Sequence, residues 1–300
     1  MSLPLSGARM MRILQRARFA LRHPVATAVY LLRGNREPLR VARVMDRAAH
    51  ERMISGRPSV LEELEAYLGL PRSEVALNLA RGHELVAARW RRENPQTPEQ
   101  IYEFHRHCSE YVYDLARWHM TPTYHGYLAL LNDERDGTVL SFGGGIGTEA
   151  LQLAAQGNEV WYCDIADSPV WKVAEWRARR RNIPIRFISD IPRGEQFDCV
   201  VAFDVFGSLA ATELEALLPR LVAVLKSGGR LYCTNNFNNT PTSPFILPHE
   251  RLWDRLVARL PLVQTEWYVY VKREAVTEGR SEGGAGKGSR TALEAPPQTE

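Results

Sequence analysis

A glycine-rich segment near the middle of the chain limits the fold more than any other part of the sequence. An apolar run at 139–142 leads into five residues, 143–147, of which four are glycine. Apolar residues then recur at helical spacing over 149–155, and a second short apolar run at 159–163 ends at Asp164. This pattern predicts a strand, a glycine turn, a helix and a second strand, the unit from which parallel α/β sheets are built.

The turn and the acidic residue after it point to a nucleoside ligand. Glycine allows positive φ and lets backbone N–H groups come close to a ligand that a Cβ atom would push away. A carboxylate at the end of the second strand can accept hydrogen bonds from both hydroxyls of a ribose. A dinucleotide fingerprint, G-x-G-x-x-G, would need a third glycine where the chain has Thr148. The spacing is instead G-x-G-x-G, which makes a nicotinamide dehydrogenase the less favoured interpretation.

This spacing, with the acid that ends the next strand, resembles the class I S-adenosylmethionine (SAM) dependent methyltransferases. Three further segments match the family in order: 185–190 its third strand, 197–204 its fourth strand, and 225–233 the turn into its fifth strand. The resemblance covers roughly a third of the chain, 139–237. It implies an α/β fold with a Rossmann-like, seven-stranded, mostly parallel sheet whose last strand, expected at 263–271, is antiparallel. It also implies SAM as cofactor and methyl transfer as the activity.

The resemblance also implies which residues contact SAM. The glycines are expected at the methionine moiety, the residues after the second strand at the ribose, and those after the third strand near the adenine. Ser141 stands where many relatives have an acid, and Asp204 is expected to face the methyl-transfer region. The expected cofactor-binding residues are Ser141, Gly143, Gly145, Gly147, Asp164, Ile165, Asp190, Ile191 and Asp204.

Candidates for contact with the acceptor lie just before the first strand. Residues 101–127 hold four of the eight histidines and five of the eleven tyrosines. A capping box at Thr97, with proline after it, predicts one helix over 98–119 on which Phe104, Cys108 and Tyr111 share a face. By likeness to small-molecule methyltransferases, Tyr111 and Tyr113 become candidates for lid or substrate contact. The candidate catalytic residues are His119, Tyr124 and His125.

The segment after the fourth strand, 204–209, lacks the Glu-His pair that one large subgroup of the family carries there. Methyl transfer can gain most of its rate from proximity and orientation, so a missing base does not exclude the reaction. It does leave a rival function open, a SAM-binding or DNA-binding regulator that keeps the fold without turnover. Two helices expected over 59–90, joined by a glycine-containing turn, also match a helix-turn-helix pattern. The second helix offers few groove-reading side chains, so a helical cap is preferred and nucleic acid is not an expected partner.

Cysteine and histidine usage indicates neither a metal site nor disulfides. His105, His107 and Cys108 point to different helix faces, and no second cluster has ligand spacing, so no metal is expected. Cys163, Cys199 and Cys233 fall in expected buried strands, and Cys108 in the expected helix, as in a cytoplasmic protein with reduced thiols.

Three regions are expected along the chain. They are a helical N-terminal region at 1–94, a SAM-dependent methyltransferase domain at 95–272, and a disordered tail at 273–300 that is rich in Gly, Ser, Glu and Pro. The acceptor is expected to be a small molecule or lipid-like, although nothing in the sequence specifies the acceptor atom.

Charge is concentrated at the start of the chain. Residues 1–55 carry eleven arginines against three acidic residues, a balance of +8. Within them, 7–33 are expected to contain an amphipathic helix with an apolar stripe of Met10, Ile13, Leu14, Ala17 and Leu21. Such a helix suits peripheral contact with an anionic membrane. The apolar stretch 25–32 is too short to span a bilayer, so the sequence leaves a cytoplasmic and a membrane-peripheral location open.

Overall fold

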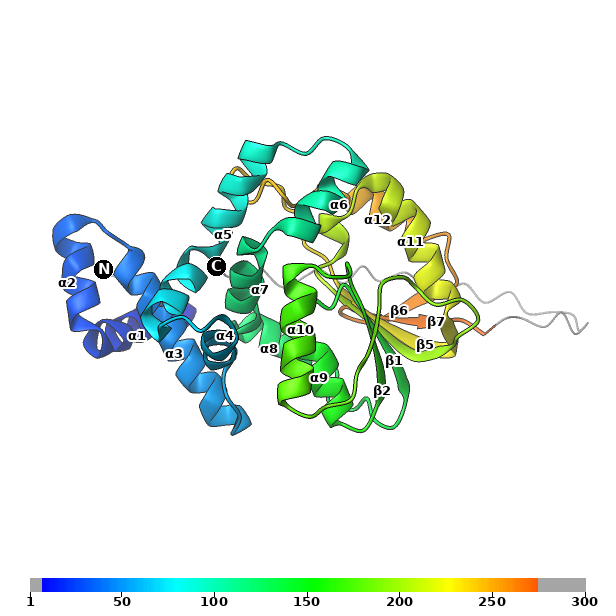
Figure 1. The fold of residues 1–300 in the computed structure, drawn as a ribbon, viewed down its shortest axis with the longest axis horizontal. Coiled ribbons are helices and arrows are strands. Elements are labelled where there is room, and N and C mark those ends of the chain that lie inside the picture. The colour runs from blue at the N-terminus through cyan, green and yellow to red at the C-terminus, as the bar shows by residue number, and fades with distance from the viewer. Residues whose placement is uncertain (1–6, 275–300) are drawn as a thin grey trace, which may run out of the picture.

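The structure, a computed structural model, describes residues 7–274. Seven strands form one sheet in the order β3-β2-β1-β4-β5-β7-β6, with helices on both faces (Figure 1). The strands are β1 Thr138–Phe142, β2 Glu159–Cys163, β3 Arg186–Ile188, β4 Phe197–Phe203, β5 Leu225–Thr234, β6 Leu262–Glu266 and β7 Val269–Lys272. β7 is antiparallel to both of its neighbours, β5 and β6, and the other neighbouring strands pair in parallel. The predicted fold class is confirmed.

Helices precede the sheet and alternate with its strands. They are α1 Gly7–Arg22, α2 Pro24–Arg33, α3 Glu37–Ser55, α4 Val60–Leu68, α5 Arg72–Glu93, α6 Pro98–His107, α7 Glu110–His119, α8 Pro122–Ala129, α9 Thr148–Ala155, α10 Pro169–Arg180, α11 Ala211–Ala223 and α12 Glu250–Val257, with a 3-10 turn, η1, at Phe206–Ser208. None of the helices in the described part is long and apolar enough to cross a membrane.

The central strands are buried on both faces, as expected of parallel strands. One face of the sheet packs on α11 and α12, in a core that includes Leu140 and Leu218. The other face packs on α9 and α10, in a core that includes Val139 and Leu153. Because β1, β2, β3 and β4 run in parallel, their carboxyl ends meet at one edge of the sheet.

The run 263–271 is two strands, so its prediction as one strand was wrong. β6 and β7 form a hairpin whose turn contains Tyr268, in the left-handed region at φ +65°. Of β6 only Leu262 is buried, because β6 is the edge strand of the sheet. The run 263–271 contains no Gly, Pro, Asn or Asp, so no typical turn residue marks the hairpin in the sequence.

The predicted helix over 98–119 is also two helices. The capping box at Thr97 begins α6 as expected, but Cys108 has an extended backbone (ψ 92°) that ends α6 and separates it from α7. Cys108 is therefore outside a helix. It is nevertheless buried with Phe104 in one cluster with Trp90 of α5, and Tyr111 packs against that cluster. Burial of these side chains holds the two helices together despite the break.

The N-terminal helices share a core with the sheet domain. Val44 of α3, Leu61 of α4 and Leu79 of α5 cluster with Ile146 of the glycine turn and Val173 of α10. The apolar face of α5 is used for this packing, which supports the helical-cap interpretation of α4 and α5. The domain boundary at residue 94 stays a prediction, and the expected disordered tail lies, from residue 275 on, outside the described residues.

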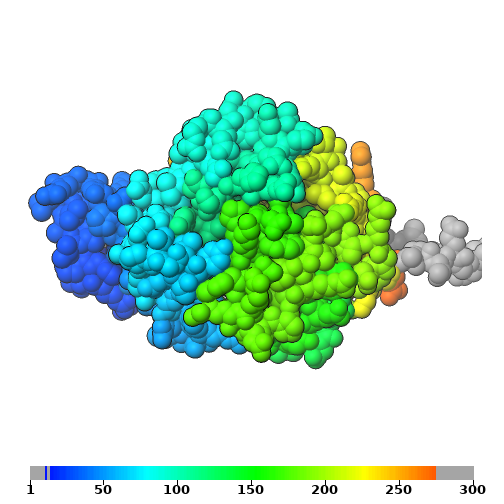
Figure 2. Space-filling view, viewed as in Figure 1, coloured from blue at the N-terminus to red at the C-terminus, as the bar shows by residue number. Residues whose placement is uncertain are grey.

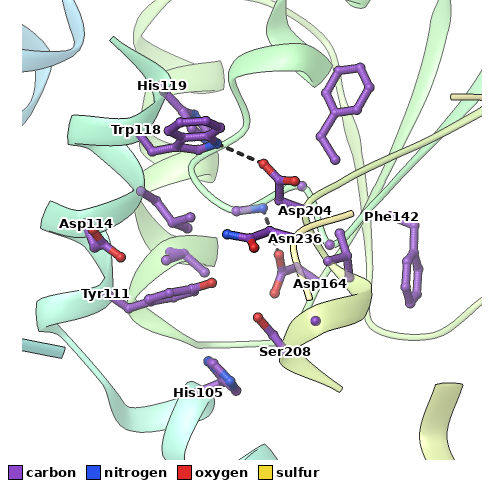
Figure 3. A pocket seen from close by; sticks show the side chains of 18 of the residues that line it. His105, Tyr111, Asp114, Trp118, His119, Phe142, Asp164, Asp204, Ser208 and Asn236 are labelled. Carbon is purple, nitrogen blue, oxygen red and sulfur yellow. Dashed lines mark hydrogen bonds between the residues drawn. The ribbon is translucent and has the colours of Figure 1, made fainter. Parts of the chain in front are cut away.

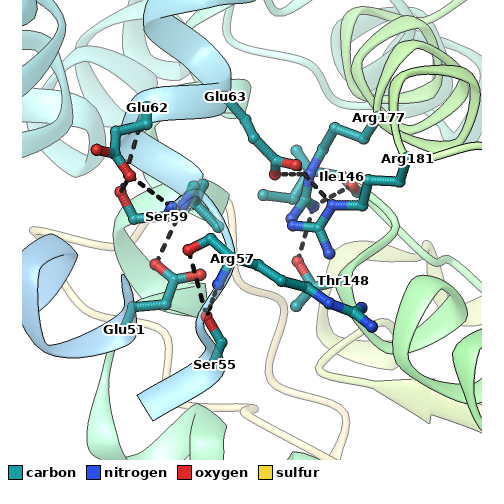
Figure 4. Close-up of polar contacts among 11 residues, drawn as sticks. Glu51, Ser55, Arg57, Ser59, Glu62, Glu63, Ile146, Thr148, Arg177 and Arg181 are labelled. Atoms are coloured by element: carbon teal, nitrogen blue, oxygen red, sulfur yellow. Dashed lines mark hydrogen bonds and ion pairs between the residues drawn. The ribbon is translucent and has the colours of Figure 1, made fainter. Parts of the chain in front are cut away.

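A buried ion pair joins the helical cap to the glycine turn (Figure 4). Arg177 Nε donates to Glu63 Oε2 at 2.7 Å, and the two side chains are each 2% exposed. Arg177 Nη1 donates to the carbonyl of Ile146 at 2.6 Å and to Thr148 Oγ1 at 2.9 Å. Arg181 Nε donates to the second oxygen of Glu63 at 2.6 Å. The start of α9 is therefore held in place from the cap.

Candidate functional site

A cavity of about 800 Å³ lies at the carboxyl edge of the sheet. Residues at the ends of β1, β2, β3 and β4 line one side of it, and α7 and the start of α8 line another. The volume is within the range of about 300–1,000 Å³ that is typical of small-molecule sites. Both the strand ends and the helices α7 and α8 are therefore needed to form this cavity.

The glycine turn forms part of the cavity wall. Gly143 and Gly145 line it and have φ of +62° and +52°, in the left-handed region. A Cβ atom on Gly143 would lie 2.5 Å from a methyl group of Val205, so no larger residue fits there. Gly147 does not line the cavity. It precedes α9, and a Cβ atom on it would lie 3.0 Å from Ala174, so its role is in helix packing.

Asp164 lies beside this turn, at the end of β2 (Figure 3). Its Oδ2 accepts a hydrogen bond from the Gly145 N–H at 2.8 Å, and its Oδ1 accepts one from the Ile165 N–H at 2.7 Å. Burial raises the pKa of Asp164 to about 6. The carboxylate is therefore ionised at neutral pH, with lone pairs left for the hydroxyls of a ligand. Ile165 also lines the cavity.

Of the other predicted cofactor-binding residues, Asp190 lines the cavity, whereas Ile191 and Ser141 lie behind its wall. Asp190 pairs with Arg220 at 2.7 Å, and the adjacent Ile191 is buried in the core. Ser141 is also buried away from the cavity, where its hydroxyl donates to Glu149 Oε1 at 3.0 Å.

Glu149, which sequence reasoning missed, lines the cavity and accepts the hydrogen bond of Ser141. Its other oxygen, Oε2, accepts a hydrogen bond from Tyr124 at 2.7 Å. Burial raises its pKa. Glu149 is the first acidic residue after the glycine turn, and this position could have identified it from the sequence.

Asp204 lies at the end of β4, opposite α7 (Figure 3). Trp118 Nε1 donates to its Oδ2 at 3.1 Å, and Thr234 Oγ1 donates to its Oδ1 at 3.0 Å. Burial raises the pKa of Asp204 to about 6. Its backbone φ of +56° is in the left-handed region, a conformation that costs roughly 1–3 kcal/mol in a residue other than glycine and that gathers at functional sites.

Two of the three candidate catalytic residues line the cavity. His119 stacks on Tyr124 with ring centroids 3.9 Å apart, and His119 Nδ1 lies 2.8 Å from Thr148 Oγ1. Burial lowers the pKa of His119 well below its ordinary value. His125 does not line the cavity, and of the two lid candidates Tyr111 lines it and Tyr113 does not.

A cluster of polar side chains from α3, α5 and α7, also missed in the sequence, completes the wall. His83 Nδ1 lies 3.3 Å from Asp114 Oδ2, and Arg117 Nη2 donates to Asp114 Oδ1 at 3.0 Å. Arg47 of α3 lines the same cavity and has no ion pair with any residue in 7–274. These residues come from three helices, so no spacing in the sequence relates them. Among the described residues no group of three or more His, Cys, Asp or Glu side chains is arranged to hold a metal ion.

Comparisons with known proteins agree with this geometry. The family model of a methyltransferase domain matches residues 140–231. No curated protein matches the chain with significance. An O-methyltransferase family protein from Burkholderia thailandensis has a similar structure, with 13% identity, a TM-score of 0.51, and coverage of 84% of this chain and 98% of that one.

Two further solved structures are similar over a shorter part of the chain. The 1,6-didemethyltoxoflavin-N1-methyltransferase of B. thailandensis has 18% identity, a TM-score of 0.46, and coverage of 60% of this chain and 92% of that one. The N-methyltransferase NodS of Bradyrhizobium japonicum has 16% identity, a TM-score of 0.41, and coverage of 51% and 96%.

The matched segment runs from β1 into β5 and contains the glycine turn, Asp164 and Asp204. The likeness in structure covers 84% of this chain and therefore extends beyond the matched segment. Residues 140–231 of this chain are therefore similar in sequence to methyltransferase domains, and its fold is similar to that of a methyltransferase-family protein.

Proposed function

We propose that the cavity binds SAM and that the protein transfers its methyl group to a small-molecule or lipid-like acceptor. The observation that carries this proposal is the buried Asp164 carboxylate, held 2.8 Å from the N–H of Gly145 at the cavity wall. A turn without side chains beside an ionised carboxylate suits a ribose and the chain attached to it. When bound, SAM supplies an electrophilic methyl carbon on a sulfonium.

The residues of the chain fit each part of SAM. Asp164 would accept hydrogen bonds from the ribose hydroxyls, with Asp190 near the adenine. Glu149, rather than Ser141, would hold the ammonium group of the methionine moiety, because its carboxylate lines the cavity and Ser141 does not. Asp204, fixed by Trp118 and Thr234, would face the region between cofactor and acceptor.

The other half of the cavity supports an acceptor with a ring or apolar chain and an acidic group. Tyr111, Trp118 and Phe245 supply aromatic surface there. Arg117 is paired with Asp114, whereas Arg47 has no ion pair in the described part of the chain. Burial, together with the charge of Arg117, lowers the pKa of Arg47. An acidic group on the acceptor would compensate that half-buried charge.

His105 is a better candidate than His119 for taking a proton from the acceptor. It lines the cavity, and its Nε2 atom is buried without a hydrogen-bond partner in the described part. Burial lowers its pKa to about 4, so the ring is neutral at pH 7 and has a nitrogen lone pair that can accept a proton. His119, by contrast, is stacked on Tyr124 and lies against Thr148, which favours a role in packing.

The cofactor site is tested by isothermal titration calorimetry with SAM. Loss of the carboxylate in Asp164→Asn removes charge-assisted hydrogen bonds worth about 1.5–3 kcal/mol, so the affinity should fall about 10- to 150-fold. Asp254→Asn, the same change on an exposed residue of α12, is the control and should bind as the wild type does. Equal affinities for all three proteins would remove Asp164 from the site.

Turnover is tested separately, by incubating the protein and methyl-labelled SAM with cell extract and separating labelled products. Transfer of label to small molecules or lipids supports the enzyme. SAM binding without transfer in any extract would favour the rival function, a regulator with this fold.

A further inference from the structure

Exposed apolar side chains are concentrated on the first two helices. Ten large apolar side chains in the described part are exposed, and six of them lie on α1 and α2. They are 50–84% exposed, and α2 has no buried residue at all. These six side chains, called here the platform, are Met11, Leu14, Leu21, Val25, Leu31 and Leu32.

The helices that carry the platform, α1 and α2, project from one end of the molecule, as the blue segment in Figures 1 and 2 shows. It is attached rather than loose, because His23 Nε2 lies 2.9 Å from Asp46 Oδ2 and Arg43 lies over the ring of Phe19. Val25 and Leu32 are two helical turns apart and therefore share one face of α2. The attachment thus leaves an apolar face of the helix exposed to solvent. Monomeric proteins rarely expose such a face unless a partner covers it.

Charge decides which partner suits this face. Residues 7–36 contain seven arginines and no acidic residue, a net charge of +7. Arg16, Arg18, Arg22 and Arg33 make no ion pair within residues 7–274. A second copy of the chain would bring like charge against like charge in a twofold contact. An anionic lipid surface offers acyl chains to the apolar side chains and headgroups to the arginines.

We propose that α1 and α2 bind the protein to an anionic membrane, with the platform at the boundary between headgroups and acyl chains. This inference stands apart from methyl transfer, since none of the platform residues lines the cavity. The two features are nevertheless adjacent. Asp46, which holds the platform, is followed by Arg47 in the cavity wall, an arrangement that suits the lipid-like acceptor of the proposed function.

The test is sedimentation of the full chain with vesicles of phosphatidylcholine alone or with phosphatidylglycerol added. The wild type should sediment with the anionic vesicles and stay in solution with the neutral ones. Each arginine near the surface contributes about 1 kcal/mol, or about fivefold in affinity, so added salt should weaken the binding strongly. Wild-type protein that stays in solution with the anionic vesicles overturns the proposal.

Matched variants separate the platform from general surface charge. Val25→Glu/Leu32→Glu should weaken binding more than about tenfold, because it places two acids in the apolar face. Met53→Glu/Ile54→Glu makes the same charge change on exposed apolar residues of α3, outside the platform, and should keep most of the binding. Equal losses in both variants would contradict the proposal.

Two controls keep the outcomes distinct. Unchanged SAM affinity and circular dichroism of Val25→Glu/Leu32→Glu would show that the variant is folded and that its cofactor site is intact. Light scattering tests the rival occupant, a second copy. The wild type could form a stable dimer, dissociated in this variant, and not bind anionic vesicles. That result would assign the platform to self-association and refute membrane binding.

Discussion

Replacing Glu63 by glutamine removes the carboxylate that neutralises two arginines between the helical cap and the glycine turn. Glu63 accepts hydrogen bonds from Arg177 at 2.7 Å and from Arg181 at 2.6 Å (Figure 4). Arg177 is 2% exposed and cannot reach water, whereas Arg181 is 19% exposed and can turn outward. The variant therefore leaves one buried cation without its counter-charge.

Breaking a buried ion pair by removing one partner costs about 3–5 kcal/mol. We expect the free energy of unfolding of Glu63→Gln to fall by this amount at pH 7. At about 2–4 °C per kcal/mol for a chain of this size, the melting temperature should fall by roughly 10 °C. Because Arg177 also donates to the carbonyl of Ile146 at the glycine turn, the affinity for SAM should fall as well.

The difference between the two proteins should depend on pH. Burial alone would raise the pKa of Glu63, but the adjacent Arg177 and Arg181 lower it below its ordinary value. A carboxyl whose folded pKa is lowered stabilises the fold above its unfolded pKa, about 4.3, and loses that contribution as pH falls through the folded pKa. The wild type and Glu63→Gln should therefore converge in stability in acid.

Urea unfolding followed by circular dichroism measures these differences. Glu65→Gln is the matched control, since Glu65 is on the same helix and makes no ion pair in the described part of the chain. We expect it to unfold within about 0.5 kcal/mol of the wild type. A loss below about 1 kcal/mol in Glu63→Gln at pH 7 would refute the idea that Arg177 depends on this carboxylate.

Two further predictions concern the cofactor site. Because burial raises the pKa of Asp164 to about 6, the SAM affinity of the wild type should fall between pH 7.5 and pH 5.5 as the carboxylate is protonated. In calorimetry, Asp164→Asn should lose most of that pH dependence. The same pH dependence in both proteins would contradict the prediction. Gly145→Ala places a Cβ atom 3.0 Å from Leu115 at φ +52° and should lower stability by about 1–2 kcal/mol and weaken SAM binding. The control is Gly126→Ala in α8, where an added Cβ atom meets open space, and it should be neutral or stabilising in the same urea assay. A Gly145→Ala variant as stable as this control would show that the turn does not require glycine.

Local pattern in the sequence was sufficient for the sheet domain. The strand, glycine turn, helix and strand around Asp164, the next strands as far as β5 and the capping box at Thr97 all lie where they were predicted. Each of these features depends on residues a few positions apart, whose periodicity, φ preference or side-chain hydrogen bond acts within one element. The family resemblance then implied a mostly parallel, seven-stranded sheet and the residues expected to contact SAM.

Tertiary packing decided the remainder. Helical spacing of apolar residues continues through the break at Cys108, and no Gly, Pro, Asn or Asp marks the turn at Tyr268, so only the contacts of the flanking segments end those elements. The site differs from expectation for the same reason. Ser141 is buried behind the cavity wall, where its hydroxyl donates to the Glu149 carboxylate, and Glu149 lines the cavity.

The polar contacts within the site and beside it join residues far apart in the chain. Arg177 and Glu63 are 114 positions apart, and Trp118 and Asp204 are 86 positions apart. The sequence by itself therefore determined the fold and the acidic and glycine residues at one wall of the cavity, because these depend on local chemistry. Only the tertiary structure decided which other side chains line the cavity and how burial shifts their pKa values, because both depend on distances that no local spacing contains.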